Sequence, residues 1–195
     1  MTRFDAVADD AGFLVVYVDS HDGTYDTRLC CKDTDRDVTF VQSVLAAVGE
    51  RWPVDPKRVY AAWLSIGAAM TYKLAVRSPG TFAAVAPVSG GFFPDPAVPD
   101  PAAAVSSPPP SVITFLGGTD SSYQDFTDGV DLWRRGAGCG EPSQTSVDRT
   151  SSNSTRCRSG LSGIRARERR RPARRRPAAA TRRRRRTVSR SPGRS

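Results

Sequence analysis

The chain has 195 residues, of which 38% are hydrophobic and 25% charged, and its formal net charge at pH 7 is +9. This length is enough for one ordinary hydrophobic core. No stretch reaches the roughly 18 consecutive apolar residues that a membrane-spanning helix needs, and the N-terminal "MTRFDAVADDAGF" lacks the basic-then-apolar order of a signal peptide. No contact with a membrane and no export signal are therefore expected from the sequence.

The first elements in chain order are a strand and a helix. Residues 12–20, "GFLVVYVDS", form a continuous Val-rich apolar run, which is typical of a parallel strand covered on both faces. Beginning at Val38, apolar residues recur at steps of 3, 4 and 3, and this spacing predicts an amphipathic helix over residues 35–52. Asp35 or Asp37 is expected to cap its first turn.

The elements that follow continue the alternation. They are expected as a strand at 59–64, a helix from 66 to about 78, strands at 82–91 and 111–120, and a helix at 126–138. A Pro-rich loop separates the last two strands, over residues 94–110. Strands and helices that alternate at this spacing predict an α/β domain with a mostly parallel sheet over residues 1–155.

The C-terminal segment differs from the rest in composition and charge. Residues 156–195 contain 17 basic residues and one acidic residue, Glu168, a net +16, whereas residues 1–155 contain 12 basic and 19 acidic residues, a net −7. The segment consists mainly of Arg, Ser, Pro and Ala, so it buries too little apolar surface to offset its ordering entropy and is expected to be a disordered tail. Such a tail neutralises phosphates, which makes nonspecific nucleic-acid binding a rival function, although no interleaved aromatic residues offer stacking.

A serine lies at the junction of the strand at 59–64 and the next helix, in the order Trp63-Leu64-Ser65-Ile66-Gly67. A serine on such a turn presents its hydroxyl above the carboxyl edge of the sheet, beside a helix N-terminus, as in the G-x-S-x-G nucleophile elbow. The alternative is a simple helix N-cap. Because Trp63 replaces the first glycine, the indole is expected to loosen the turn or to displace the next strand.

The run "VDPKRVYAAWLSIGAAMTYKLAVRSPGTFAAVAPVSGG" resembles the polyhydroxybutyrate depolymerase and feruloyl esterase family of secreted α/β-hydrolases, and the likeness extends from about residue 3 to about residue 157. It implies a partial α/β-hydrolase fold, an extracellular location and hydrolysis of carboxylic esters of polyesters or plant polysaccharides, with no cofactor. Ser65 would then be the nucleophile, and the backbone N–H of Ile66 would be an oxyanion donor.

The resemblance also suggests an acid and a disulfide. "FLGGTD" is similar to the family's H-G-T-x-D strand end, so Asp120 would be the triad acid, and the alternative is a turn aspartate after two glycines. Cys139 and Cys157 stand where relatives have a disulfide-linked pair, and Cys30 and Cys31 also have counterparts. A zinc site is not expected because the sequence has no C-x-x-C and only one histidine.

Parts of the family pattern have no counterpart. The histidine, His21, precedes the serine, whereas the family's base follows the acid and lies downstream of the second cysteine, where this chain has arginine repeats. Nothing supplies the H-G-like second oxyanion donor, and a missing central strand would leave the strands at 12–20 and 59–64 to pair directly or stay apart. Two explanations fit: a hydrolase half-domain with an added cationic tail, or a non-functional gene fragment with a late start and a frameshift near Cys157. Either predicts an inactive or strongly impaired esterase.

Overall fold

The computed structural model describes residues 3–20, 23–29, 35–94, 100–105, 108–140, 143–147 and 150–154. All of them belong to the first of two compact units, Met1–Ser162. The segment 156–195 lies outside the described residues, so its disorder and the domain boundary near residue 155 stay predictions.

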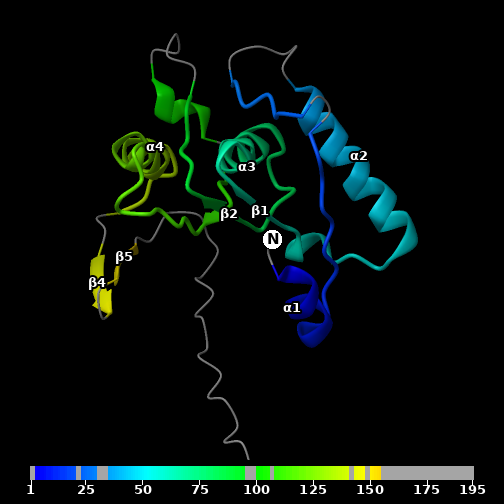
Figure 1. Ribbon diagram of the computed structural model, residues 1–195. Coiled ribbons are helices and arrows are strands. Elements are labelled where there is room, and N and C mark those ends of the chain that lie inside the picture. Colours follow the sequence, from blue (N-terminus) through cyan, green and yellow to red (C-terminus); the bar gives the residue numbers. More distant parts are fainter. Residues whose placement is uncertain are drawn as a thin grey trace, which may run out of the picture. The chain divides into compact units, whose positions relative to one another are not determined.

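Helices and a small parallel sheet make up this unit (Figure 1). The helices are α1 (Phe4–Ala11), α2 (Arg36–Arg51), α3 (Ile66–Arg77) and α4 (Tyr123–Gly136), with 3₁₀ turns η2 (Pro56–Arg58) and η3 (Pro101–Ala104). Strands β1 (Tyr60–Leu64), β2 (Ala84–Val88) and β3 (Ser111–Val112) form a three-stranded sheet in the order β1-β2-β3, in which both pairings are parallel. Strands β4 (Ser143–Val147) and β5 (Thr150–Ser154) pair as an antiparallel hairpin. The predicted α/β class with a parallel sheet is confirmed, whereas α1 and the hairpin were not predicted.

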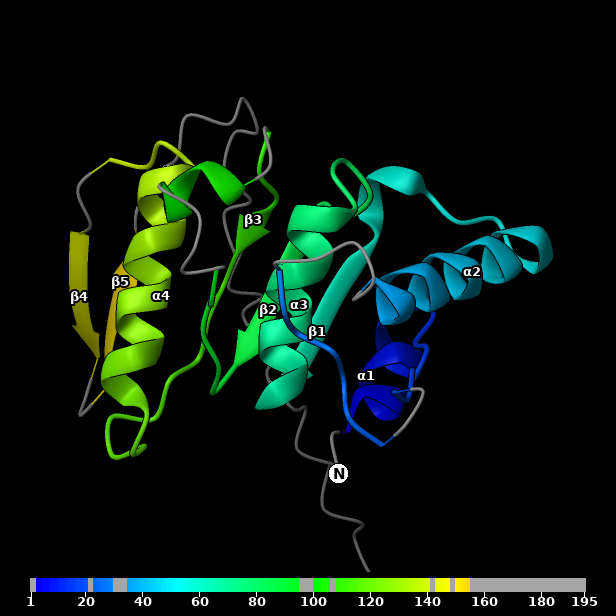
Figure 2. The same cartoon turned by 90° about the horizontal axis from the view of Figure 1, so that it is seen from above.

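Helix α3 lies across β1 and β2 and forms the centre of the core (Figure 2). Its side chains are buried along most of its length; Met70 and Leu74 have no exposed surface. Ala61 of β1 and Val85 of β2 are buried in the same cluster. Each large apolar side chain buried in this way contributes about 1.5–3 kcal/mol relative to its exposed state, so α3 is held firmly against the strands that flank Ser65.

The opposite face of the sheet remains open in the described part of the chain. Side chains alternate between the two faces of a strand, and the outward set is strongly exposed: Tyr60 is 56%, Leu64 65%, Ile113 56% and Phe115 54% exposed. An all-parallel sheet is normally covered on both faces. These residues therefore form an apolar surface that nothing in the described ranges covers.

The prediction of a strand over residues 12–20 is wrong. This segment is extended but belongs to no strand, and β1 is an edge strand of the sheet. Several of its apolar side chains, among them Leu14 and Val16, are exposed. Of the two outcomes expected for the segments 12–20 and 59–64, pairing or separation, the structure has the second. An apolar run indicates a strand only where a neighbouring strand offers hydrogen bonds, and β1 receives them from β2 alone among the strands described.

The third strand is shorter than the predicted range 111–120. The backbone N–H groups of Ser111, Ile113 and Phe115 donate in turn to the carbonyls of Ala83, Val85 and Pro87, and the last of these bonds is 3.2 Å long. Pro87 thus lies on the side of β2 that faces β3, where it has no N–H to donate in return. The ladder is interrupted there, which explains why β3 itself extends only from Ser111 to Val112.

Helix α2 confirms the predicted helix at 35–52, and Val38 and Val41 are buried as its spacing requires. The predicted side-chain cap is wrong for Asp35, which occupies the N-cap position without a cap hydrogen bond. Its carboxylate instead forms ion pairs with Lys73 at 3.6 Å and Arg77 at 3.4 Å, both on α3. Asp35 therefore joins two helices rather than closing the end of one.

No helix in the described ranges is long and apolar enough to cross a membrane.

Candidate functional site

Ser65 lies at the carboxyl end of β1 with a backbone conformation that L-residues rarely adopt. Its φ is 59° and its ψ is −124°, a region that costs a non-glycine residue on the order of 1–3 kcal/mol. The turn is fixed by two hydrogen bonds: the Ser65 N–H donates to the carbonyl of Val88 at 2.9 Å, and the Ser65 carbonyl accepts from the N–H of Ala68 at 2.8 Å. Such strain is found at functional sites more often than elsewhere.

The hydroxyl of Ser65 is not used to cap α3. Ser65 stands at the N-cap position of that helix, but its side chain makes no cap hydrogen bond, and the residue is exposed. An ordinary N-cap serine has an extended backbone and accepts a hydrogen bond from the second or third helical N–H. Ser65 therefore occupies the N-cap position, as the alternative interpretation has it, but lacks both features of an ordinary capping serine.

Two glycines allow the chain to pass close to this turn. A Cβ at Gly90 would lie 2.7 Å from the carbonyl oxygen of Ser65 and 2.5 Å from the Cβ of Ala68, and a Cβ at Gly67 would lie 2.6 Å from Cδ1 of Trp63. Carbon atoms normally approach to about 3.5–4.0 Å. Close packing on both sides thus holds the turn in its strained form.

Trp63 is accommodated without the distortion that the sequence predicts. The β1–β2 register continues through Trp63 opposite Pro87 and Leu64 opposite Val88, and Ser65 keeps its positive φ. The indole N–H donates to the hydroxyl of Tyr25 at 3.1 Å. The expectation of a loosened turn or a displaced strand is wrong, because the indole lies over Gly67 and finds a polar partner.

Ile66 is the first residue of α3 and is 52% exposed. The backbone N–H groups of a helix's first turn have no partner within the helix, and the helix dipole concentrates positive potential there. The N–H of Ile66 is thus placed next to Ser65 at a position suited to an oxygen that becomes negatively charged.

Ser89 is a second strained residue that sequence reasoning missed. Its φ is 45°, and Ser65 is the other non-glycine residue with positive φ in the described part of the chain. Ser89 directly follows β2, in line with Ser65, and its N–H donates to the carbonyl of Phe115 at 2.8 Å. The Ser-Gly-Gly sequence at 89–91 is a turn signal that could have identified this position.

Asp120 lies in the turn that precedes α4, beyond the carboxyl end of β3, so the topology brings it to the same sheet edge as Ser65 with β2 between them. Its side chain is engaged locally: Oδ1 accepts from the N–H of Ser122 at 3.0 Å, and its carbonyl accepts from the N–H of Tyr123 at 3.0 Å. This is the geometry of a turn aspartate, the alternative that the sequence left open.

Of the predicted cysteines and the histidine, only Cys139 lies in the part of the chain that the structure describes. Cys139 is disulfide-bonded, but Cys157, its expected partner, lies outside the described residues, so the pairing stays a prediction. His21, Cys30 and Cys31 also lie outside them. In the ranges that the structure describes, no group of three or more His, Cys, Asp or Glu residues could hold a metal ion.

Comparison with known proteins gives a family and two relatives. The family model described as Esterase PHB depolymerase matches residues 1–106, which include Ser65 and Ile66 but not Asp120. Feruloyl esterase B of Piromyces equi is 26% identical over 171 residues, which cover 77% of this chain and 32% of that protein. The protein named "Putative esterase NocK" of Nocardia uniformis subsp. tsuyamanensis is 29% identical over 177 residues, which cover 87% of this chain and 49% of that protein. The chain therefore spans about a third of the first relative and about half of the second, and no solved structure matches it.

Proposed function

Because the chain belongs to the Esterase PHB depolymerase family, we propose that its chemistry is that of a serine hydrolase of carboxylic esters and that Ser65 is the nucleophile. The observation that carries this proposal is the strained turn at Ser65, whose φ is 59° and whose side chain does not cap the helix that follows. A hydroxyl held in this way at a strand-to-helix turn is the arrangement of a nucleophile elbow. The parallel sheet around it is, on this proposal, part of an α/β-hydrolase fold.

In the proposed reaction the Oγ atom of Ser65 attacks the acyl carbonyl of an ester, and its proton passes to a general base. The carbonyl oxygen becomes negative and is stabilised by the N–H of Ile66 at the start of α3. The alcohol leaves with a proton, and water then releases the acyl group from Ser65. Asp120 would act as the acid that orients and stabilises the base, which requires its carboxylate to serve the base as well as the Ser122 N–H.

The proposed substrates follow from the names of the family and of the relatives. A polyester is suggested by the PHB depolymerase family, and an aromatic or acetyl ester of plant polysaccharide is suggested by feruloyl esterase B. We also propose an extracellular location, because such polymeric substrates occur outside the cell.

We expect the 195-residue chain to be a very slow esterase. Its single histidine, His21, precedes the nucleophile in the sequence, whereas the base of this fold follows the acid in chain order. Residues of a triad act as a unit, so loss of the base alone costs on the order of 10⁶ in kcat. The residual rate depends on the oxyanion donor and on substrate binding.

The test is hydrolysis of p-nitrophenyl butyrate by the full chain, with Ser65→Ala as the control and with imidazole added as an external base. We expect a rate close to that of Ser65→Ala without imidazole, and a rate clearly above it when imidazole is present, because the added base replaces the missing side chain. Equal rates for both proteins at every imidazole concentration would show that Ser65 is not a nucleophile. A fast rate without imidazole would require another base, and His21→Ala would then be the first variant to measure.

Nonspecific nucleic-acid binding by residues 156–195 is a second candidate function. The net charge of +16 in this segment supports it, because basic side chains that neutralise phosphates release counterions and give affinity without regard to sequence. This function does not depend on Ser65. A chain shortened to residues 1–155 should lose nucleic-acid binding and keep the chemistry proposed for Ser65.

A further inference from the structure

The indole of Trp63 makes a specific polar and aromatic contact with Tyr25, a residue 38 positions earlier in the chain. The indole N–H donates to the Tyr25 hydroxyl at 3.1 Å. The two rings meet edge to face, with centroids 6.0 Å apart and an interplanar angle of 76°. An edge-to-face pair with an added hydrogen bond fixes both the position and the rotation of the indole.

The same indole borders the turn that contains Ser65. Trp63 lies two residues before Ser65, and its Cβ, Cγ and Cδ1 atoms occupy the space beside Gly67, the second residue of α3. No Cβ fits between them, because it would lie within 2.8 Å of all three atoms. Any rotation of the indole therefore moves the first turn of α3 or is blocked by it, and that turn carries the N–H of Ile66.

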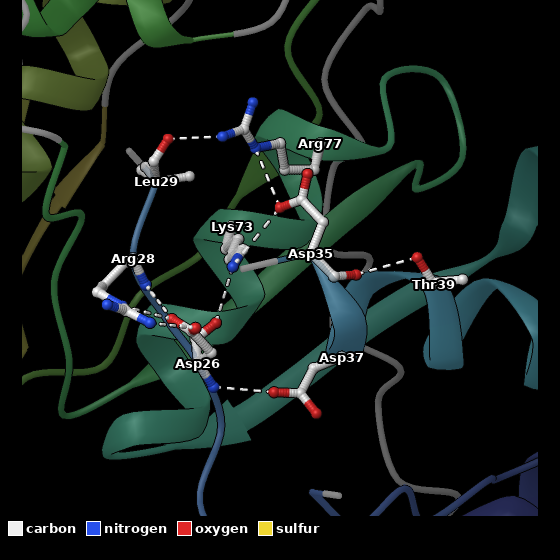
Figure 3. A network of polar contacts seen from close by, with 8 residues as sticks. All are labelled: Asp26, Arg28, Leu29, Asp35, Asp37, Thr39, Lys73 and Arg77. Carbon is white, nitrogen blue, oxygen red and sulfur yellow. Dashed lines mark hydrogen bonds and ion pairs between the residues drawn. The ribbon is translucent and has the colours of Figure 1, made fainter. Parts of the chain in front are cut away.

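Tyr25 is itself held in place from both sides. Its hydroxyl donates to the carbonyl of Val18. The next residue, Asp26, accepts at its carbonyl from Nζ of the fully buried Lys73 at 2.9 Å and donates its N–H to Oδ2 of Asp37 at 2.8 Å, as Figure 3 shows. Lys73 belongs to α3. The contacts from Gly67 through Trp63, Tyr25 and Asp26 therefore lead back to the same helix at Lys73.

Arg77 of α3 makes two further bonds to the segments that lie against this helix. Arg77 of α3 donates to the carbonyl of Leu29 at 2.6 Å and pairs with Asp35 at 3.4 Å (Figure 3). Burial raises the pKa of Tyr25, so its hydroxyl keeps its proton at neutral pH and can donate and accept at once. The segment 25–29 is thus bonded to α3 at Asp26, through Lys73, and at Leu29, through Arg77.

We propose that Tyr25 is a positioning residue for Ser65, which acts by holding the indole of Trp63 against the first turn of α3. This proposal rests on the proposed role of Ser65 as a nucleophile. Trp63 stands where the elbow pattern has glycine, so the indole must be restrained if the turn is to keep its geometry. The Tyr25 hydroxyl supplies that restraint, and its removal is expected to leave Ser65 and the Ile66 N–H in a broader range of positions. Misplacement of reacting groups by about 1 Å costs up to about 100-fold in rate.

The experiment uses the full chain and a small alkyl fluorophosphonate, in which Oγ of Ser65 displaces fluoride from phosphorus to form a stable adduct. Because the adduct accumulates, even a slow reaction is measurable by mass spectrometry, with imidazole supplied as the base. Tyr25→Phe removes the hydroxyl and keeps the ring, Trp63→Phe removes the indole N–H, and the double variant removes both. Tyr60→Phe is the matched control, because Tyr60 is an exposed tyrosine on β1 that faces away from α3.

We expect Tyr25→Phe to lower the maximal labelling rate about tenfold while the half-saturating probe concentration stays unchanged. The double variant should be no slower than Trp63→Phe alone, because the two groups act through one hydrogen bond. Tyr60→Phe should label like the wild type. A wild-type rate in Tyr25→Phe, or independent effects that multiply in the double variant, would overturn the proposal. If Trp63→Phe does not fold, Tyr25→Phe decides alone, since it removes one oxygen atom.

Amide hydrogen exchange separates this proposal from the function of Ser65. Tyr25→Phe should increase exchange about tenfold in a peptide covering residues 63–68, with no change in α4. If the wild type is not labelled at Ser65 and this increase is seen, the proposed function fails and the support of the turn by Tyr25 stands. If exchange at 63–68 is unchanged, the proposal fails whatever the labelling result.

Discussion

Replacement of Gly67 by alanine tests the packing beside Ser65 directly. A Cβ at this position would lie 2.6 Å from Cδ1, 2.7 Å from Cβ and 2.8 Å from Cγ of Trp63, roughly 1 Å short of an ordinary carbon–carbon contact. The indole cannot swing away easily, because the Trp63 Cβ is bonded to the strand backbone and the indole N–H is held by Tyr25. Overpacking of this kind costs about 1–3 kcal/mol.

Helix propensity acts in the opposite direction and is the smaller effect here. Alanine is favoured over glycine by up to about 1 kcal/mol in a helix interior, and Gly67 lies in the first turn of α3, where the gain is less. We therefore expect Gly67→Ala to lower the free energy of unfolding by about 1–2 kcal/mol, which corresponds to a fall in Tm of about 2–8 °C for a domain of this size. Urea unfolding followed by circular dichroism measures it.

Gly49→Ala is the matched control. Gly49 also lies within a helix, α2, but no atom would lie within 4 Å of a Cβ there. This variant should be as stable as the wild type or more stable by about 0.5–1 kcal/mol. In a Trp63→Gly background the cost of Gly67→Ala should disappear, because the clashing atoms are gone. A Gly67→Ala protein as stable as Gly49→Ala, or a cost that persists without the indole, would refute the reasoning.

Two further outcomes are expected. The hydrogen bonds from Arg28 lower the pKa of Asp26, so this carboxylate stabilises the fold above its unfolded pKa of about 4 and the contribution is lost as the pH falls through the lowered folded value. Asp26→Asn should therefore cost about 0.5 kcal/mol at pH 7 in urea unfolding, a small value because Arg28 is exposed. The difference from the wild type should vanish near pH 2, and a cost that is the same at both pH values would contradict this expectation. Mobility-shift titrations with duplex DNA should show binding by the full chain that weakens about 10³-fold between 50 and 200 mM salt, and none by residues 1–155; equal shifts by both would exclude the Arg-rich segment as the cause.

Local patterns were sufficient to predict several elements. The helix α2 follows from the 3- and 4-residue spacing of Val38 and Val41, which places both on one face that any core would bury. The β1–Ser65–α3 unit follows from an apolar run that changes period at a serine, and the polar stop at Ser78 ends the helix as expected. Each of these depends on neighbours in sequence, so no knowledge of distant partners was needed.

The failures of prediction arise where a distant partner decides. Residues 12–20 have the composition of a buried strand but pair with no other strand, because hydrogen bonds between strands depend on which segments the fold brings together. Asp35 has the position of a helix cap and is drawn instead to Lys73 and Arg77 on α3.

The candidate site shows the same division. The sequence by itself indicated Ser65 at a strand-to-helix turn, because the pattern that predicts this turn consists of five adjacent residues. Only the tertiary structure decided that Trp63 fits there, since its acceptor on Tyr25 comes from a loop 38 residues away and that loop is fixed in turn by Lys73. The Ser-Gly-Gly signal indicates a turn at Ser89, but the positive φ of this residue became visible only in the assembled sheet, where its N–H donates to the carbonyl of Phe115. A sequence pattern specifies what one segment can do locally, whereas the position of a side chain is set by close packing and hydrogen bonds to segments that the sequence does not place beside it.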